Sequence, residues 1–154
     1  MAAGAVQVYD FFCKYIQIGG ADLDTNTIKC ALVSSAYTLD QVNHDTWSDI
    51  SANEIANGNG YTTGGATLGS IAVTAVTGGY KFASANVTWT ASGGNIPAWR
   101  RAVFYISGTV NSVVDPIIAT FLGDSTPADV PATSSGNALT LTCPAGGWFD
   151  VTRA

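Results

Sequence analysis

Charged side chains are scarce in this 154-residue chain. Asp, Glu, Lys and Arg make up 11% of it, less than half of the ~25% typical of globular domains. A protein that remains alone in solution normally carries more surface charge than this. The shortage therefore indicates that part of the surface packs against another protein.

Basic residues are the scarcest charged class. Six Lys and Arg stand against eleven Asp and Glu, giving a net charge of -5, and the one adjacent basic pair is Arg100-Arg101. Binding to nucleic acid phosphates or to an anionic membrane surface needs clustered Lys and Arg. We therefore expect neither nucleic acid nor membrane as a partner.

The residues that build metal and redox sites are also few. The three cysteines, Cys13, Cys30 and Cys143, are widely separated and show no CxxC or Cys/His ligand spacing. We expect free, buried thiols, in agreement with synthesis in a reducing cytoplasm. Asp22, Asp24 and Asn26 alternate as in a calcium loop, but the required glycine and final glutamate are missing, which favours a simple turn.

Catalytic motifs are missing as well. The single histidine, His44, lies in a polar stretch with no nucleophile motif nearby, so we interpret it as an exposed loop residue. The single glutamate, Glu54, could pair with an aspartate as in a glycosidase, yet nothing marks such a pair as buried. We expect no catalytic residue, no cofactor and no metal site, and hence a protein that is not an enzyme.

The N-terminus has no basic and apolar signal-peptide pattern, and no run approaches the ~18 apolar residues of a membrane span. The chain is therefore expected to be a soluble protein that starts in the cytoplasm where it is made.

Alternating apolar residues and turn residues predict a mainly β fold. Residues 27–33 form a clear strand, with Ile28, Cys30 and Leu32 on one face. Gly/Asn/Pro turns separate further candidate strands at 71–76, 80–83, 86–90, 100–107, 117–122, 138–142 and 147–152. We predict one domain, residues 1–154, built as an antiparallel β-sandwich or barrel-like fold.

Two short helices complete the prediction. Residues 5–17 show helical spacing, although 5–9 could instead be a strand. A second helix is expected over 46–56, where Ser51 and Glu54 have capping-box spacing. The strand at 102–106 is apolar on both faces, so it is either central or covered by the N-terminal helix.

Several aromatic residues lie in or beside predicted loops. Tyr37, Trp47, Tyr61 and Trp99, with Arg100, form the candidate protein interface, because Trp, Tyr and Arg are enriched at such surfaces. The aromatic residues could instead fill the ends of the sandwich, or bind sugar rings by stacking. Trp89, at an inward strand position, is expected in the core, and the loop 125–135 is a candidate for a mobile or partner-ordered segment.

The order of these motifs over nearly the whole chain resembles a family of small structural proteins of tailed bacteriophages. The resemblance rests on YDFFCK (9–14), ADLDTNTIKCAL (21–32), HDTWSD (44–49), GNGYTTGG (58–65), VTWTASGG (87–94), RAVFY (101–105) and DPII (115–118). It implies a virion protein without catalytic residues.

Within that family, the resemblance favours a capsid decoration (cement) protein that binds the major capsid protein. It would be made in the host bacterial cytoplasm, located in the virion, and expected to form a homo-oligomer, with a trimer favoured. A tail- or baseplate-associated protein, or the base of a head fibre, is the alternative. A carbohydrate-binding module on the virion surface is a third hypothesis.

Overall fold

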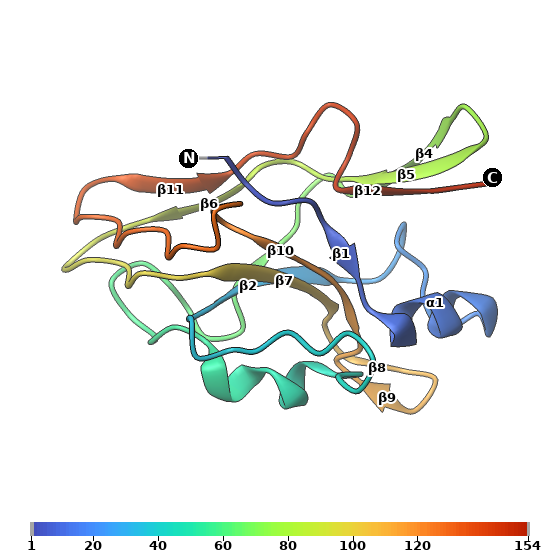
Figure 1. Ribbon diagram of the computed structural model, residues 1–154, viewed down its shortest axis with the longest axis horizontal. Helices are drawn as coiled ribbons and strands as arrows, with labels where there is room; N and C mark the ends of the chain where they lie inside the picture. Colours follow the sequence, from blue (N-terminus) through green and yellow to red (C-terminus); the bar gives the residue numbers. More distant parts are fainter. Residues whose placement is uncertain (1, 154) are drawn as a thin grey trace.

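The computed structural model describes residues 2–153 as a mainly β, two-layered structure (Figure 1). Its helical elements are α1 (Asp10–Gln17) and the 3-10 turns η1 (Trp47–Asp49) and η2 (Ser51–Asn53). Its strands are β1 (Gln7–Val8), β2 (Ile28–Val33), β3 (Ala66–Thr67), β4 (Ala72–Val76), β5 (Gly79–Ala83), β6 (Val87–Thr90), β7 (Arg101–Ile106), β8 (Thr109–Val110), β9 (Val113–Val114), β10 (Ile117–Leu122), β11 (Ala138–Leu141) and β12 (Phe149–Thr152).

The first layer is a five-stranded antiparallel sheet with the order β1-β10-β7-β2-β3. The second layer lies across it and consists of two small sheets placed end to end, β11-β6 and β12-β5-β4 (Figure 1). A short hairpin, β8-β9, extends from the end of the first sheet. This arrangement confirms the predicted antiparallel, sandwich-like β fold.

The two small sheets are one interrupted ribbon. The chain runs from β5 into β6 on one side and from β11 into β12 on the other. Three hydrogen bonds close the break: the Trp148 N–H donates to the Phe82 carbonyl at 2.8 Å, the Trp148 indole to Ser84 Oγ at 2.8 Å, and the Cys143 N–H to Asn86 Oδ1 at 3.1 Å.

Aromatic side chains join the two layers. Trp148, from the ribbon, lies with its ring centroid 4.9 Å from that of Phe104 and 5.7 Å from that of Phe121, both in the first sheet. Trp89 enters the same core from β6 and is buried, as predicted. Such aromatic pairs add about 0.5–1.5 kcal/mol each beyond the apolar area that they bury.

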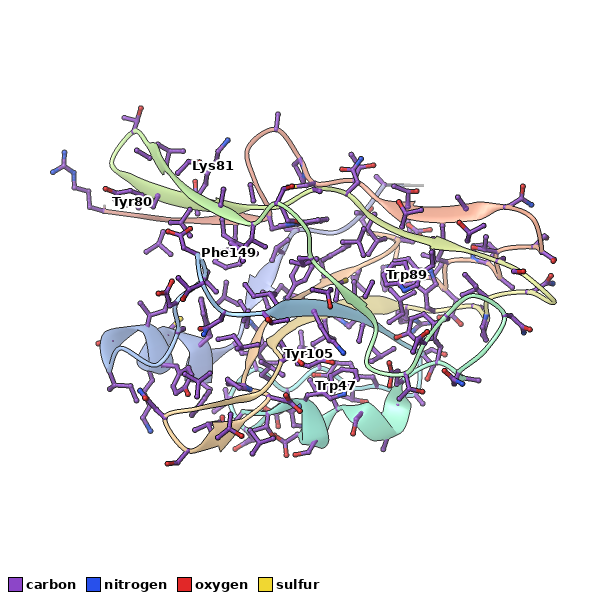
Figure 2. All side chains as sticks on the ribbon, turned by 180° about the vertical axis from the view of Figure 1, so that it is seen from behind. Trp47, Tyr80, Lys81, Trp89, Tyr105 and Phe149 are labelled. Atoms are coloured by element: carbon purple, nitrogen blue, oxygen red, sulfur yellow. The ribbon has the colours of Figure 1, made fainter. Side chains whose placement is uncertain are left out.

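The opposite face of the first sheet is covered by the irregular segment 34–56. Val103 and Tyr105 of β7 point to this side and are buried. Trp47 stacks on Tyr105 with a centroid distance of 5.0 Å and an interplanar angle of 6° (Figure 2). β7 is therefore the central strand and is covered on both faces. The segment 34–56, and not the N-terminal helix, covers the face that points away from the ribbon, because α1 packs Phe12 and Tyr15 into the core between the layers.

All eight predicted strands are present, with ends within two residues of the expected ones. The predicted helix over 5–17 begins only at Asp10, because residues 7–8 pair with β10 as β1. The strand alternative at the start of that segment is thus partly correct.

The predicted short helix over 46–56 is present only as two 3-10 helices of three residues each, η1 and η2. The capping box lies at Thr46 and Asp49 rather than at Ser51 and Glu54. A helix cannot continue past residue 53, because the Ile55 N–H donates to the Leu32 carbonyl at 3.0 Å and so pairs with β2.

The cysteines are free thiols, but only one is fully buried. Cys30 is enclosed in the core, and burial raises the pKa of its thiol. Cys143 is partly exposed, and Cys13 is exposed, which corrects the expectation of buried thiols. Cys13 lies on the outward side of α1, whose inward side presents Phe12 and Tyr15.

Truncating Phe104 to alanine should lower the free energy of unfolding by about 3–5 kcal/mol, because a cavity opens beneath Trp148. Urea denaturation followed by tryptophan fluorescence measures this loss. Val42→Ala, at an exposed apolar position, is the control and should stay within about 1 kcal/mol of the wild type. Equal losses in the two variants would contradict the assignment of Phe104 to the core.

Candidate protein-interaction site

The predicted interface aromatics are not on the surface. Tyr37 is 5% exposed, Trp47 8%, Tyr61 1% and Trp99 2%. They fill the two cores because the loops that carry them fold over the sheets. Their burial agrees better with the alternative prediction, in which these aromatic residues fill the ends of the sandwich, than with an exposed interface. In this fold they offer neither an exposed interface nor a surface for stacking sugars.

Arg100, the fifth predicted interface residue, is partly exposed and forms a salt bridge with Asp129 at 2.8 Å. The loop 125–135, expected to be mobile, is tied to the body by backbone pairs. Val130 exchanges two hydrogen bonds with Trp99, at 2.8 and 3.2 Å, and Thr133 pairs with Ile96. Its ordering therefore comes from within the chain.

His44 is half-buried rather than exposed, which corrects the prediction. Its Nδ1 lies 3.1 Å from the hydroxyl of Tyr37, which in turn lies 2.8 Å from the hydroxyl of Tyr9. Burial raises the pKa of both tyrosines, so both remain protonated donors. This chain of hydrogen bonds fastens the 34–56 cover to the first sheet.

Glu54 has a structural role of the same kind. Its Oε1 accepts hydrogen bonds from the Tyr61 hydroxyl and from the Gly64 N–H, both at 2.7 Å. The Tyr61 oxygen also accepts the Leu32 N–H at 2.9 Å, and burial raises the pKa of Tyr61. The carboxylate thus holds the loop 57–65 against β2.

The Asp22–Asn26 segment is a turn, as predicted. Oδ1 of Asp22 accepts the N–H groups of Asp24 at 3.0 Å and Thr25 at 3.3 Å. Within residues 2–153 no group of three or more His, Cys, Asp or Glu side chains could hold a metal ion. Over the same range, no helix is long and apolar enough to cross a membrane.

Asp49 anchors the start of the 3-10 turns. Its Oδ2 accepts the Thr46 N–H at 2.9 Å, the Asp45 N–H at 3.0 Å and the Thr46 hydroxyl at 3.0 Å. Burial works to raise the pKa of Asp49, but these hydrogen bonds outweigh it and lower the pKa overall.

We expect Asp49→Ala to cost about 1 kcal/mol of unfolding free energy at pH 7. Because the folded-state pKa lies below the unfolded one, this contribution is present above about pH 4 and is lost as pH falls through the folded-state pKa. Urea denaturation should therefore show a smaller difference in unfolding free energy between Asp49→Ala and the wild type at pH 3 than at pH 7. Asp150→Ala, at an exposed carboxylate, is the control, and an Asp49→Ala gap that persists unchanged at pH 3 would contradict the assignment.

Two apolar grooves do reach the surface. The first, called here the edge groove, has a volume of about 370 Å³ and lies between residues 3–6 and β11. Phe121, Trp148 and Val130 contribute to its wall. Trp99 also lines it, and its buried indole N–H has no hydrogen-bond partner within residues 2–153.

The edge groove is bordered by an open strand edge. In the described part of the chain β11 pairs only with β6. The Ala91 N–H donates to the Asn137 carbonyl at 2.9 Å, so Leu139, two residues on, also belongs to a hydrogen-bonded pair. The backbone of the next residue, Thr140, therefore faces away from β6 and is free to pair with an added strand.

The second groove, called here the arm groove, has a volume of about 420 Å³. It lies between α1 with residues 21–24 and the three-stranded arm formed by β4, β5 and β12, which projects beyond the first sheet (Figure 1). Tyr80 and Lys81 lie on this arm (Figure 2). Tyr80 and Val151 are among the most exposed large apolar side chains described, at 59% and 61%.

Comparisons with protein-family models, with curated proteins and with solved structures found no match for this chain.

Proposed function

We propose that the chain is a structural protein of a tailed-phage virion, and in particular a capsid decoration protein that binds the shell of major capsid protein. The resemblance in motif order, the 11% of charged residues and the two surface grooves support this proposal. A tail- or baseplate-associated protein, or the base of a head fibre, would use the same surfaces on a different partner.

The observation that carries the proposal is the edge groove beside the open edge of β11. An extended segment of a partner could pair with the Thr140 backbone while its alternate side chains enter the apolar groove. Strand addition of this kind obtains its affinity from main-chain hydrogen bonds and its specificity from side-chain pockets. Groove and edge thus form a surface suited to a polypeptide strand.

A decoration protein stabilises a shell by binding only its assembled form. The stabilisation then grows with the ratio of free protein concentration to the dissociation constant. This function requires no catalytic group. It requires a broad protein interface, for which a sparsely charged, Thr- and Ser-rich surface around an apolar centre is suitable.

Thr140→Pro should weaken binding to shells at least tenfold, because it removes the outward N–H while leaving the ladder to β6 intact. Co-sedimentation with empty shells of the major capsid protein measures this binding. Thr140→Ala, which keeps the N–H, is the matched control and should bind like the wild type. Val6→Asp, on the opposite rim of the groove, is a second variant that should also fail to bind.

Saturable, stoichiometric sedimentation of the wild-type protein with shells supports the decoration role. Failure of the folded wild type to sediment with intact shells would overturn it, and isolated tails would then be the next partner to test. Equal binding by Thr140→Pro and Thr140→Ala would exclude the edge groove as the binding site.

A further inference from the structure

We propose that the arm groove is the contact between copies of this chain: the apolar face of one arm packs into the arm groove of a second copy. The inference concerns self-association and does not depend on the proposed function. It rests on the register of the arm strands, on the exposure of one row of side chains, and on a match of charges.

Strand pairing arranges the inner face of the arm in two rows. Phe149 lies opposite Phe82, which lies opposite Val73, and this row meets the body of the protein. Phe82 is almost fully buried, and its ring centroid lies 5.5 Å from that of Phe149. The row nearest the body is therefore already packed.

The second row continues the same apolar face beyond the body. Val151 lies opposite Tyr80, and both are exposed by about three-fifths. Across the groove, Ile16 of α1 is 41% exposed. Three large apolar side chains thus border one open groove, and an exposed apolar cluster of this kind marks a protein contact.

The charges around the arm groove favour a second copy as the occupant. Asp22 and Asp24 line the groove, and among the hydrogen bonds described their side-chain oxygens accept only backbone N–H groups. Lys81 also lines the groove, but its Nζ donates to the Ala145 carbonyl at 2.7 Å and forms no salt bridge with these carboxylates within residues 2–153. Hydrogen bonds from Thr25 and from the Asp24 N–H keep the pKa of Asp22 below its usual value, so this carboxylate is charged at neutral pH.

The matching positive charge lies on the arm itself. The Arg153 N–H donates to the Gly78 carbonyl at 3.0 Å, so Arg153 continues the alternation of β12 and falls on the face of Val151. Arg153 is exposed, and the one salt bridge described within residues 2–153 is Arg100–Asp129. An arm that enters another copy's groove brings Val151 to its apolar wall and Arg153 to its carboxylates.

Each copy therefore carries both halves of the contact, the arm and the groove. In a reciprocal pair of copies or a closed ring, every arm would occupy the arm groove of another copy. Such closed symmetric assemblies are the usual form of homo-oligomers. The acidic net charge of -5 opposes association, so the local pairing of Arg153 with the groove carboxylates is needed to orient the copies.

The test is the solution mass of the full chain, measured by sedimentation velocity and light scattering from 1 to 200 µM without shells. We expect the mass of an oligomer, which is two or more times the 15.8 kDa of one chain. Val151→Asp and Arg153→Glu should each weaken self-association at least tenfold. Thr152→Asp, which adds the same charge to the outer face of the same strand, is the matched control and should associate like the wild type.

A wild-type protein that remains at 15.8 kDa up to 200 µM would overturn the inference. An oligomer that Val151→Asp and Arg153→Glu leave intact would also overturn it, because the copies would then meet elsewhere. Unfolding midpoints of the variants, checked in urea, separate loss of association from loss of folding.

The two proposals fail separately. A monomeric protein that still sediments with shells would contradict only the proposed arm contact. An oligomeric protein that binds neither shells nor tails would contradict only the proposed virion role.

Discussion

The structure depends on two inner strands of the first sheet, β2 and β7, which place buried apolar side chains on both of its faces. Their side chains alternate between two cores, with Phe104 on one side of the sheet and Tyr105 on the other. A sheet with two apolar faces needs two covers. The ribbon supplies one through Trp148, and the irregular segment 34–56 supplies the other through Trp47. The hydrogen bonds of Glu54, His44 and Asp49 all serve to hold this second cover and the loop after it in place.

This constraint also explains which sequence-based predictions succeeded. Apolar runs bounded by turn residues are a local pattern, so they located all eight predicted strands, and alternation within 86–90 gave the inward position of Trp89. The fate of Trp47, Tyr61 and Trp99 depends on contacts with residues far along the chain, such as the stacking of Trp47 on Tyr105. Their position in predicted loops suggested that these aromatic residues lie on the surface, but tertiary packing buries them.

The candidate grooves were beyond prediction for a related reason. The segments 71–76, 80–83 and 147–152 were each predicted as strands, but the sequence does not show which strand pairs with which. The row of Tyr80 and Val151 exists only because β5 pairs with β12, and the open strand edge beside the edge groove exists because β11 pairs, within residues 2–153, with β6 alone. Whether apolar side chains form an exposed row thus depends on which strands pair, and this cannot be seen in any one segment.

The pairing of distant strands has a kinetic consequence. Ile28 pairs with Ile106 and Phe82 with Phe149, so much of the fold closes long loops, and folding on the order of milliseconds to seconds is typical of such topologies. The β4-β5 hairpin is local and can form early, whereas β12 joins it only when the distant ribbon assembles. The exposed apolar face of the arm is therefore complete only in a chain that has nearly finished folding, so the contact between copies that we propose for this face would form only after the core is closed.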